Sequence, residues 1–167
     1  MSRADINPKE TGGRNSIPVD RWVVAAGTPI GIKAGEPCKQ NATSSEVTRL
    51  LEDADLTIAT DQPMTGIAAA DSSETASASG YSDQYVPLAD IKWEIKTKTS
   101  AETNTQAKID ALKGELTLID LTSSVFTIDT TGTAATAAFL IVGGDPDRST
   151  VHFRIRPDAC SYGRAAV

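Results

Sequence analysis

The chain has little of the chemistry that most enzymes and metalloproteins use. Its 167 residues include one histidine, two cysteines and eight aromatic residues. A single imidazole and two thiols exclude multi-histidine and cysteine-rich metal sites, and they also exclude a disulfide scaffold. The sequence contains neither G-x-G-x-x-G nor G-x-x-x-x-G-K-[ST], the glycine-rich patterns that bind nucleotides. The sequence therefore predicts a protein that needs no metal and no cofactor.

Positive charge and long apolar runs are also scarce. The chain has 16 basic and 22 acidic residues and a net charge of −6, which argues against a nucleic-acid partner. The most apolar run, 137–142, is too short to cross a bilayer, and the first sixteen residues lack the apolar core of a signal peptide. We expect a protein made in the cytoplasm without a membrane partner, in which Cys38 and Cys160 are reduced.

Serine and threonine, by contrast, make up 34 of the 167 residues, and threonine favours strands. From residue 19 onward, strand signals recur about every ten residues, as in a barrel or sandwich. The clearest are 91–98 and 151–156, in which apolar and polar residues alternate, so that Trp93 faces the core and Glu94 faces away from it. Weaker strands are expected at 21–25, 29–33, 46–50, 56–60, 65–69, 84–88, 115–121, 125–129 and 137–142.

One short surface helix is predicted at about 100–113. Thr99 and Glu102 have the spacing of a capping box, and Gly114 stands where a helix would end in a left-handed turn. Between them, apolar residues such as Ile109 and Leu112 recur at helical spacing. The fold class predicted from the sequence is all-β, a small barrel or sandwich with this one helix.

The chain divides into an N-terminal arm, residues 1–18, and a β domain, residues 19–167. The arm has too few apolar residues to form part of a core, so it is either a frayed terminus or an extended segment that docks on a neighbouring subunit. In the second case its contact residues would be Arg3, Ile6, Lys9, Arg14 and Ile17. Residues 46–83 hold eight acids and one base, which is either a solvated face or a patch for a basic partner.

No constellation of residues indicates catalysis. His152 is predicted to lie exposed on the outer side of its strand beside Arg154, and no carboxylate in that strand could orient it as a base. The tight acidic groups at 52–55 and 145–147 are typical of a loop and a reverse turn, and neither has the spacing of a calcium loop. Both tryptophans are expected in the core. We therefore expect no enzymatic activity.

Several segments between Gly27 and Leu88 resemble the small β-barrel decoration, or cement, proteins on the heads of tailed bacteriophages. These segments read GTPIGIKAGEPC, MTGIAAADSSETASASG and YVPL, with an acidic connector after the first. In that family a strand matching 64–68 precedes a polar loop and another short strand. Farther on, NTQAKIDALKG (104–114) and FLIVGGDPD (139–147) are similar to extended members of the group.

The resemblance implies a virion structural protein on the capsid exterior that binds the major capsid protein and stabilises the assembled shell. It implies no catalytic, cofactor-binding or metal-binding residues. Closed cyclic assemblies are the usual solution for repeated sites, so we expect a homo-oligomer, a trimer first and a dimer second. The alternative is a non-catalytic β-sandwich module that binds carbohydrate or a host surface.

Overall fold

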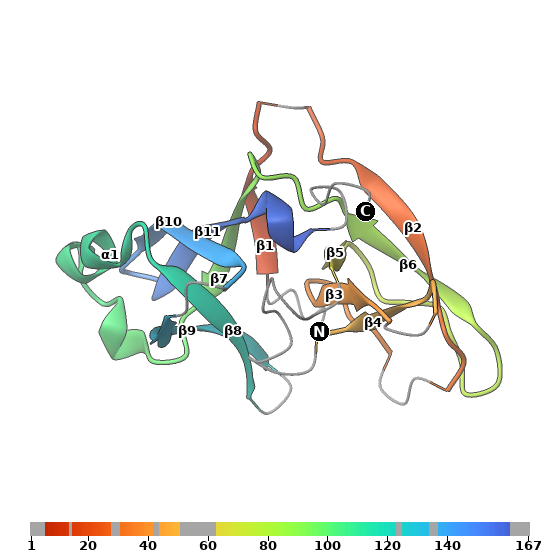
Figure 1. Cartoon of the computed structure of the whole chain (residues 1–167). Helices are drawn as coiled ribbons and strands as arrows, with labels where there is room; N and C mark the ends of the chain where they lie inside the picture. Colours follow the sequence, from red (N-terminus) through yellow and green to blue (C-terminus); the bar gives the residue numbers. More distant parts are fainter. Residues whose placement is uncertain are drawn as a thin grey trace.

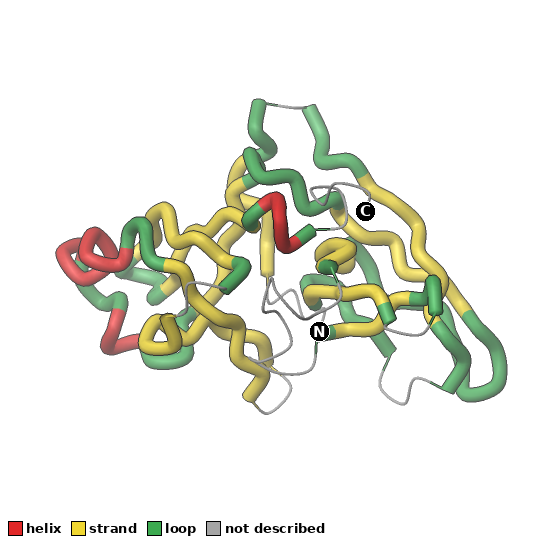
Figure 2. Tube along the Cα trace, viewed as in Figure 1, coloured by secondary structure: helices red, strands yellow, loops and turns green. Residues whose placement is uncertain are grey.

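The computed structural model contains two β units (Figure 1). It describes residues 6–13, 15–27, 31–41, 44–50, 63–122, 125–133 and 137–160. The strands of the two units form a closed five-stranded barrel and a six-stranded antiparallel sheet, with one short α-helix among the described residues (Figure 2). The prediction of a mostly β protein with one short helix is confirmed.

The barrel has the strand order β2-β4-β3-β5-β6 and closes where β6 pairs with β2. Its strands are β2 (Val19–Val24), β3 (Pro37–Gln40), β4 (Val47–Arg49), β5 (Met64–Ala68) and β6 (Gly80–Tyr85). The pairs are antiparallel except for the single parallel contact between β2 and β4. A small apolar cluster fills the interior, with Trp22 packed against it half-buried: Val24, Ile32, Cys38, Val47 and Ala68.

The second unit is a sheet with the order β1-β7-β11-β10-β8-β9. Its strands are β1 (Ile6–Glu10), β7 (Lys92–Lys96), β8 (Leu116–Thr122), β9 (Val125–Thr133), β10 (Phe139–Asp145) and β11 (Thr150–Ile155). The sheet curls on itself, because the Lys98 amide after β7 donates to the Ile128 carbonyl of β9 over 2.9 Å. One face of the curled sheet therefore encloses a core.

The larger core joins the two units. From the sheet it takes Trp93, Phe139 and Phe153, of which the two phenylalanines meet edge to face with centroids 5.3 Å apart. From the barrel it takes Met64 and Ile67. The expectation that Trp93 belongs to the core is confirmed. Because the cluster is shared, each unit buries apolar surface of the other, which favours one rigid body.

Part of the N-terminal arm belongs to this core, contrary to the prediction that the arm stands apart from it. Residues Ile6–Glu10 form β1, an edge strand that pairs with β7 through the register Ile6 to Ile95. Ile6 and Ile17 are both buried in the shared cluster. The segment is poor in apolar residues, but pairing with β7 satisfies its backbone and places its one inward isoleucine in the core.

The helix begins later than the sequence predicted. Ser100–Glu102 is a 3-10 turn, and α1 spans Gln106–Leu112 with Thr105, not Thr99, as the residue whose side chain accepts from the Lys108 amide. Thr99 makes no capping hydrogen bond, so the predicted capping box is wrong. Gly114 has a φ of 91°, which confirms the predicted left-handed end.

The helix packs on the sheet through one close approach to β10. Ile109 is buried, and a Cβ atom built on Gly144 would lie 3.1 Å from its side chain and 2.5 Å from the Thr150 carbonyl. Only glycine fits at this position without moving backbone. The pair explains why α1 can lie close against the strand.

The other strand predictions have mixed outcomes. Strands form within or across most of the predicted ranges, including 91–98 and 151–156. The ranges 29–33 and 84–88 are wrong in part, because 31–33 and 86–88 are not strands, while β3 and the first half of β6 were missed. The range 56–60 lies outside the described residues.

Candidate functional site

The structure describes three of the five residues predicted to contact a neighbour, Ile6, Lys9 and Ile17. Ile6 and Ile17 are buried within their own chain, so they do not form surface anchors. Lys9 lies on the sheet surface, where its Nζ is 3.2 Å from a Glu94 carboxylate oxygen. Arg3 and Arg14 lie outside the described residues. The three described residues thus do not form one surface site.

Glu94 is the centre of a polar cluster on the outer face of the sheet. Its carboxylate accepts from Lys9 over 3.2 Å and from the Thr150 hydroxyl over 3.3 Å. Arg148, in the turn between β10 and β11, places a guanidinium nitrogen 2.9 Å from the other oxygen. The His152 Nε2 lies 3.3 Å away. Three strands and a turn are therefore joined through one buried carboxylate.

Opposing effects act on the pKa of this carboxyl group. Burial alone would raise the pKa of Glu94, because it disfavours the charged form. Hydrogen bonds from Lys9 and His152 and the charge of Arg148 act the other way and hold the pKa below its ordinary range. Glu94 therefore remains ionised at neutral pH.

His152 lies on the outer face as predicted, but the prediction that it is exposed is wrong. Its side chain is only 14% exposed, and Glu94 is its direct partner in the ladder between β7 and β11. The sequence could not reveal this contact, since the partner stands 58 residues away. The carboxylate orients the imidazole, but Lys9 and Arg148 share that carboxylate, which is typical of a structural ion cluster.

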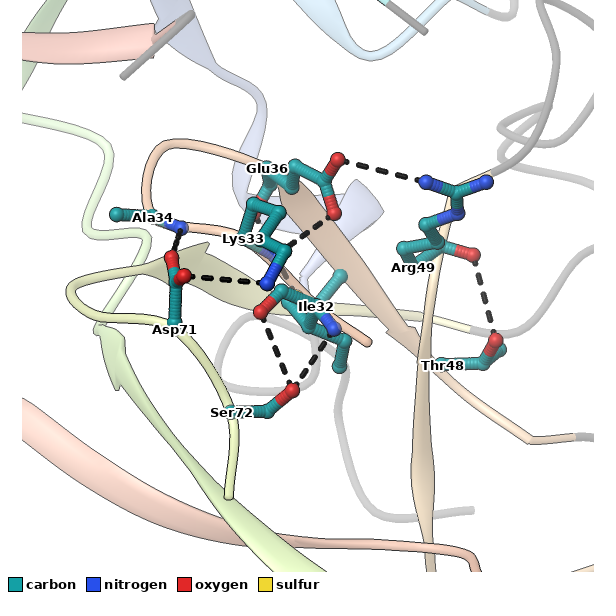
Figure 3. A network of polar contacts seen from close by, with 9 residues as sticks. Ile32, Lys33, Ala34, Glu36, Thr48, Arg49, Asp71 and Ser72 are labelled. Atoms are coloured by element: carbon teal, nitrogen blue, oxygen red, sulfur yellow. Dashed lines mark hydrogen bonds and ion pairs between the residues drawn. The ribbon is translucent and has the colours of Figure 1, made fainter. Parts of the chain in front are cut away.

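A second polar network ties together the loop before β3 and the loop after β5 (Figure 3). Asp71 accepts from the Ala34 amide over 3.0 Å and pairs with Lys33 over 3.1 Å, and these contacts lower the pKa of its carboxyl group. Ser72 exchanges two hydrogen bonds with the backbone of Ile32. The network fixes loop geometry at one part of the barrel.

The same network contains a buried ion pair. Glu36, which is fully buried, accepts from the Lys33 amide over 2.9 Å, and its other oxygen lies 3.5 Å from a guanidinium nitrogen of Arg49 (Figure 3). Arg49 is the single base in the acidic segment 46–83. Its charge is therefore paired with Glu36 inside the barrel and does not offset the acids on the outer surface.

The barrel has an exposed face on the ladder between β2 and β6. Side chains at alternate positions of a strand share a face, and the register pairs Val23 with Tyr81 and Arg21 with Asp83. Val19, Val23 and Tyr81 on this face are 49%, 41% and 54% exposed. They account for three of the four large apolar side chains that are exposed in the described part of the chain. We refer to Val19, Arg21, Val23, Tyr81 and Asp83 as the barrel face.

The charges on the barrel face are paired with each other. Arg21 donates two hydrogen bonds to Asp83, over 2.7 and 3.0 Å, and these bonds lower the pKa of the Asp83 carboxyl group. The Arg21 guanidinium also lies 5.7 Å from the centre of the Tyr81 ring. The hydrogen bonds to Asp83 and the contact with the Tyr81 ring hold the Arg21 side chain in place in the free protein. Less side-chain entropy is therefore lost on binding.

Within the described ranges, no group of three or more histidine, cysteine or acidic side chains is placed to hold a metal ion. The same part of the chain contains no helix with the length and apolarity needed to span a membrane. Cys38 and Cys160 are buried free thiols. The acids at 52–55 lie outside the described residues, and Asp145 and Asp147 form a turn in which the Asp147 amide donates to the Asp145 carboxylate.

Comparison with known proteins identifies no relative of the chain. No family model, no curated protein and no solved structure matches the chain.

Proposed function

We propose that the chain is a virion structural protein that binds the outside of an assembled tailed-phage capsid and stabilises the shell. The observation that carries the proposal is the barrel face, where Val19, Val23 and Tyr81 surround a paired Arg21 and Asp83. Tyrosine and arginine with apolar neighbours are the composition found at the centre of protein interfaces. A protein surface, namely the major capsid protein, is the partner that fits it.

The architecture supports the same role. A capsid-binding protein transmits stability between shell subunits only if its own body resists deformation. Here the barrel and the sheet share one apolar cluster, and Glu94 joins β1, β7, β11 and the Arg148 turn. β5 (Met64–Ala68) also falls where the resemblance to decoration proteins expects a strand, although 86–88 does not form the second one.

The carbohydrate-binding alternative has less support. Sugar-binding modules generally offer several exposed aromatic rings, because rings stack on the apolar faces of sugars. Among the described aromatic side chains, Tyr81 is the one that is exposed, while Tyr85 packs on Trp93 with centroids 6.1 Å apart. A single ring beside valines fits a protein partner better.

The proposal is tested by cosedimentation with heads of the encoding phage that lack this protein. We expect wild-type protein to sediment with the heads and to saturate. Val23→Ser should weaken binding by on the order of tenfold, because it removes an apolar contact near the centre of the interface. Val125→Ser is the matched control, since Val125 is 42% exposed but lies on β9 of the sheet.

Two outcomes would contradict the proposal. Folded wild-type protein that does not bind at saturating concentration would remove the capsid as partner. Equal weakening by Val23→Ser and Val125→Ser would show that the barrel face is not the contact. Sedimentation velocity of the free protein tests the accompanying proposal of a homo-oligomer, with a trimer expected before a dimer.

A further inference from the structure

The outer face of the six-stranded sheet carries a group of bases that are far apart in the sequence. Lys9, Arg148 and His152 all contact the Glu94 carboxylate. Lys92 and Lys96 lie two residues to either side of Glu94 in β7, and Arg154 lies two residues beyond His152 in β11, so that all share this side of the sheet. The basic face consists of Lys9, Lys92, Lys96, Arg148, His152 and Arg154.

The bases of this face exceed its acids. Lys92 pairs with Glu10, whose pKa is lowered first by the hydrogen bond from Lys92 and further by the charges of Arg154 and His152. Asp145 stands opposite Thr150 at the far edge. Five permanently charged bases thus lie beside four carboxylates, those of Glu10, Glu94, Asp145 and, in the Arg148 turn, Asp147. An excess of positive charge in a chain of net charge −6 marks a distinct surface.

Arg148, Lys96 and Arg154 of this face are also accessible. Arg148 contacts Glu94 through one guanidinium nitrogen, and 58% of its side chain is exposed. Lys96 and Arg154 are exposed on strands whose neighbouring residues are buried in the core. Because the buried neighbours fix these strands, the backbone needs little reorganisation when the face receives carboxylates, and arginine can receive them bidentately.

We propose that the basic face binds an acidic protein surface. A nucleic acid fits less well, because Glu10 is 58% exposed within the face and would repel an evenly charged phosphate backbone. A protein partner can place carboxylates on Lys96 and Arg154 and a base or neutral group beside Glu10. This binding surface lies on the sheet, whereas the capsid-binding proposal rests on the barrel, so each can fail without the other.

The experiment uses the full chain and a labelled peptide of alternating glutamate and serine, which puts its carboxylates on one side when extended. Fluorescence anisotropy should show binding that weakens as salt is raised. The double variant Lys96→Glu with Arg154→Glu should bind on the order of tenfold more weakly at low salt. Lys113→Glu reverses one charge beside α1, half the change of the double variant and far from the face in sequence, and should bind as the wild type does.

Circular dichroism of each variant establishes that it is folded, and Arg154→Gln, which removes charge without reversing it, should show a smaller loss in the same direction. Absence of peptide binding by the folded wild type would overturn the proposal. Equal loss in the Lys113→Glu control would overturn it too, since binding would then depend only on net charge. Tighter binding of a DNA duplex than of the peptide would assign the face to nucleic acid instead.

Discussion

The cluster around Glu94 gives a prediction whose size follows from the contacts. Glu94→Gln keeps the shape of the side chain but removes its charge, leaving Lys9, Arg148 and His152 without a common counter-ion. Removing one partner of a fully buried pair costs about 3–5 kcal/mol. Lys9 and Arg148 are 40% and 58% exposed and regain water, so the expected loss is lower, about 2 kcal/mol.

Urea unfolding at neutral pH measures this loss, with Glu115→Gln as the matched control at an exposed position. The pH dependence carries a second test. Because the folded pKa of Glu94 lies below its ordinary value of 4.5, its contribution to stability is complete above that value and is lost as the pH falls through the lowered pKa. The difference in free energy of unfolding between wild type and Glu94→Gln should therefore become smaller at acidic pH.

A Glu94→Gln protein as stable as Glu115→Gln at neutral pH would refute the reasoning, because the carboxylate would then not hold β1 to the sheet. If this difference in free energy of unfolding became larger at acidic pH, the lowered pKa of Glu94 would be refuted.

Three further predictions concern the core and its thiols. Ile6→Ala should lower the free energy of unfolding in urea by about 3 kcal/mol, because the side chain is buried in the shared cluster. A negligible loss would show that β1 is a loose arm and not part of the core. Gly80→Ala should cost about 3 kcal/mol, since its Cβ would lie 2.1 Å from the Glu74 amide nitrogen, whereas Gly143→Ala, with 3.7 Å of space, should stay near wild type. Burial raises the pKa of Cys38, so Ellman's reagent should leave it unmodified until the protein unfolds, and prompt labelling would contradict its placement.

The elements that the sequence predicts best are those whose own side chains encode two faces. In β7 the alternation of Trp93 and Ile95 with charged residues requires a half-buried strand in any fold that has a core. β1 carries only Ile6 on its inward side and depends on β7 for its hydrogen bonds. Its strand character therefore comes from tertiary pairing, which a reading of local pattern does not capture.

The same distinction applies to the surface sites. The alternation places Glu94 on the outer face correctly, but the charges that pair with it there come from Lys9 and Arg148, which are distant in sequence. The barrel face requires the register of β2 on β6, since nothing in the local pattern pairs Arg21 with Asp83. The helix begins later than the sequence predicts, and Glu102 does not serve as a capping residue but accepts a hydrogen bond from Thr130 of β9.

We propose that the barrel face lies against a capsid surface. A cryo-electron microscopy reconstruction of heads with and without the protein tests it most directly. We predict added density on the outer surface of the shell, with β2 and β6 facing the capsid and Tyr81 in contact with it. Saturated heads without added density, or with β2 and β6 turned toward solvent, would contradict the account.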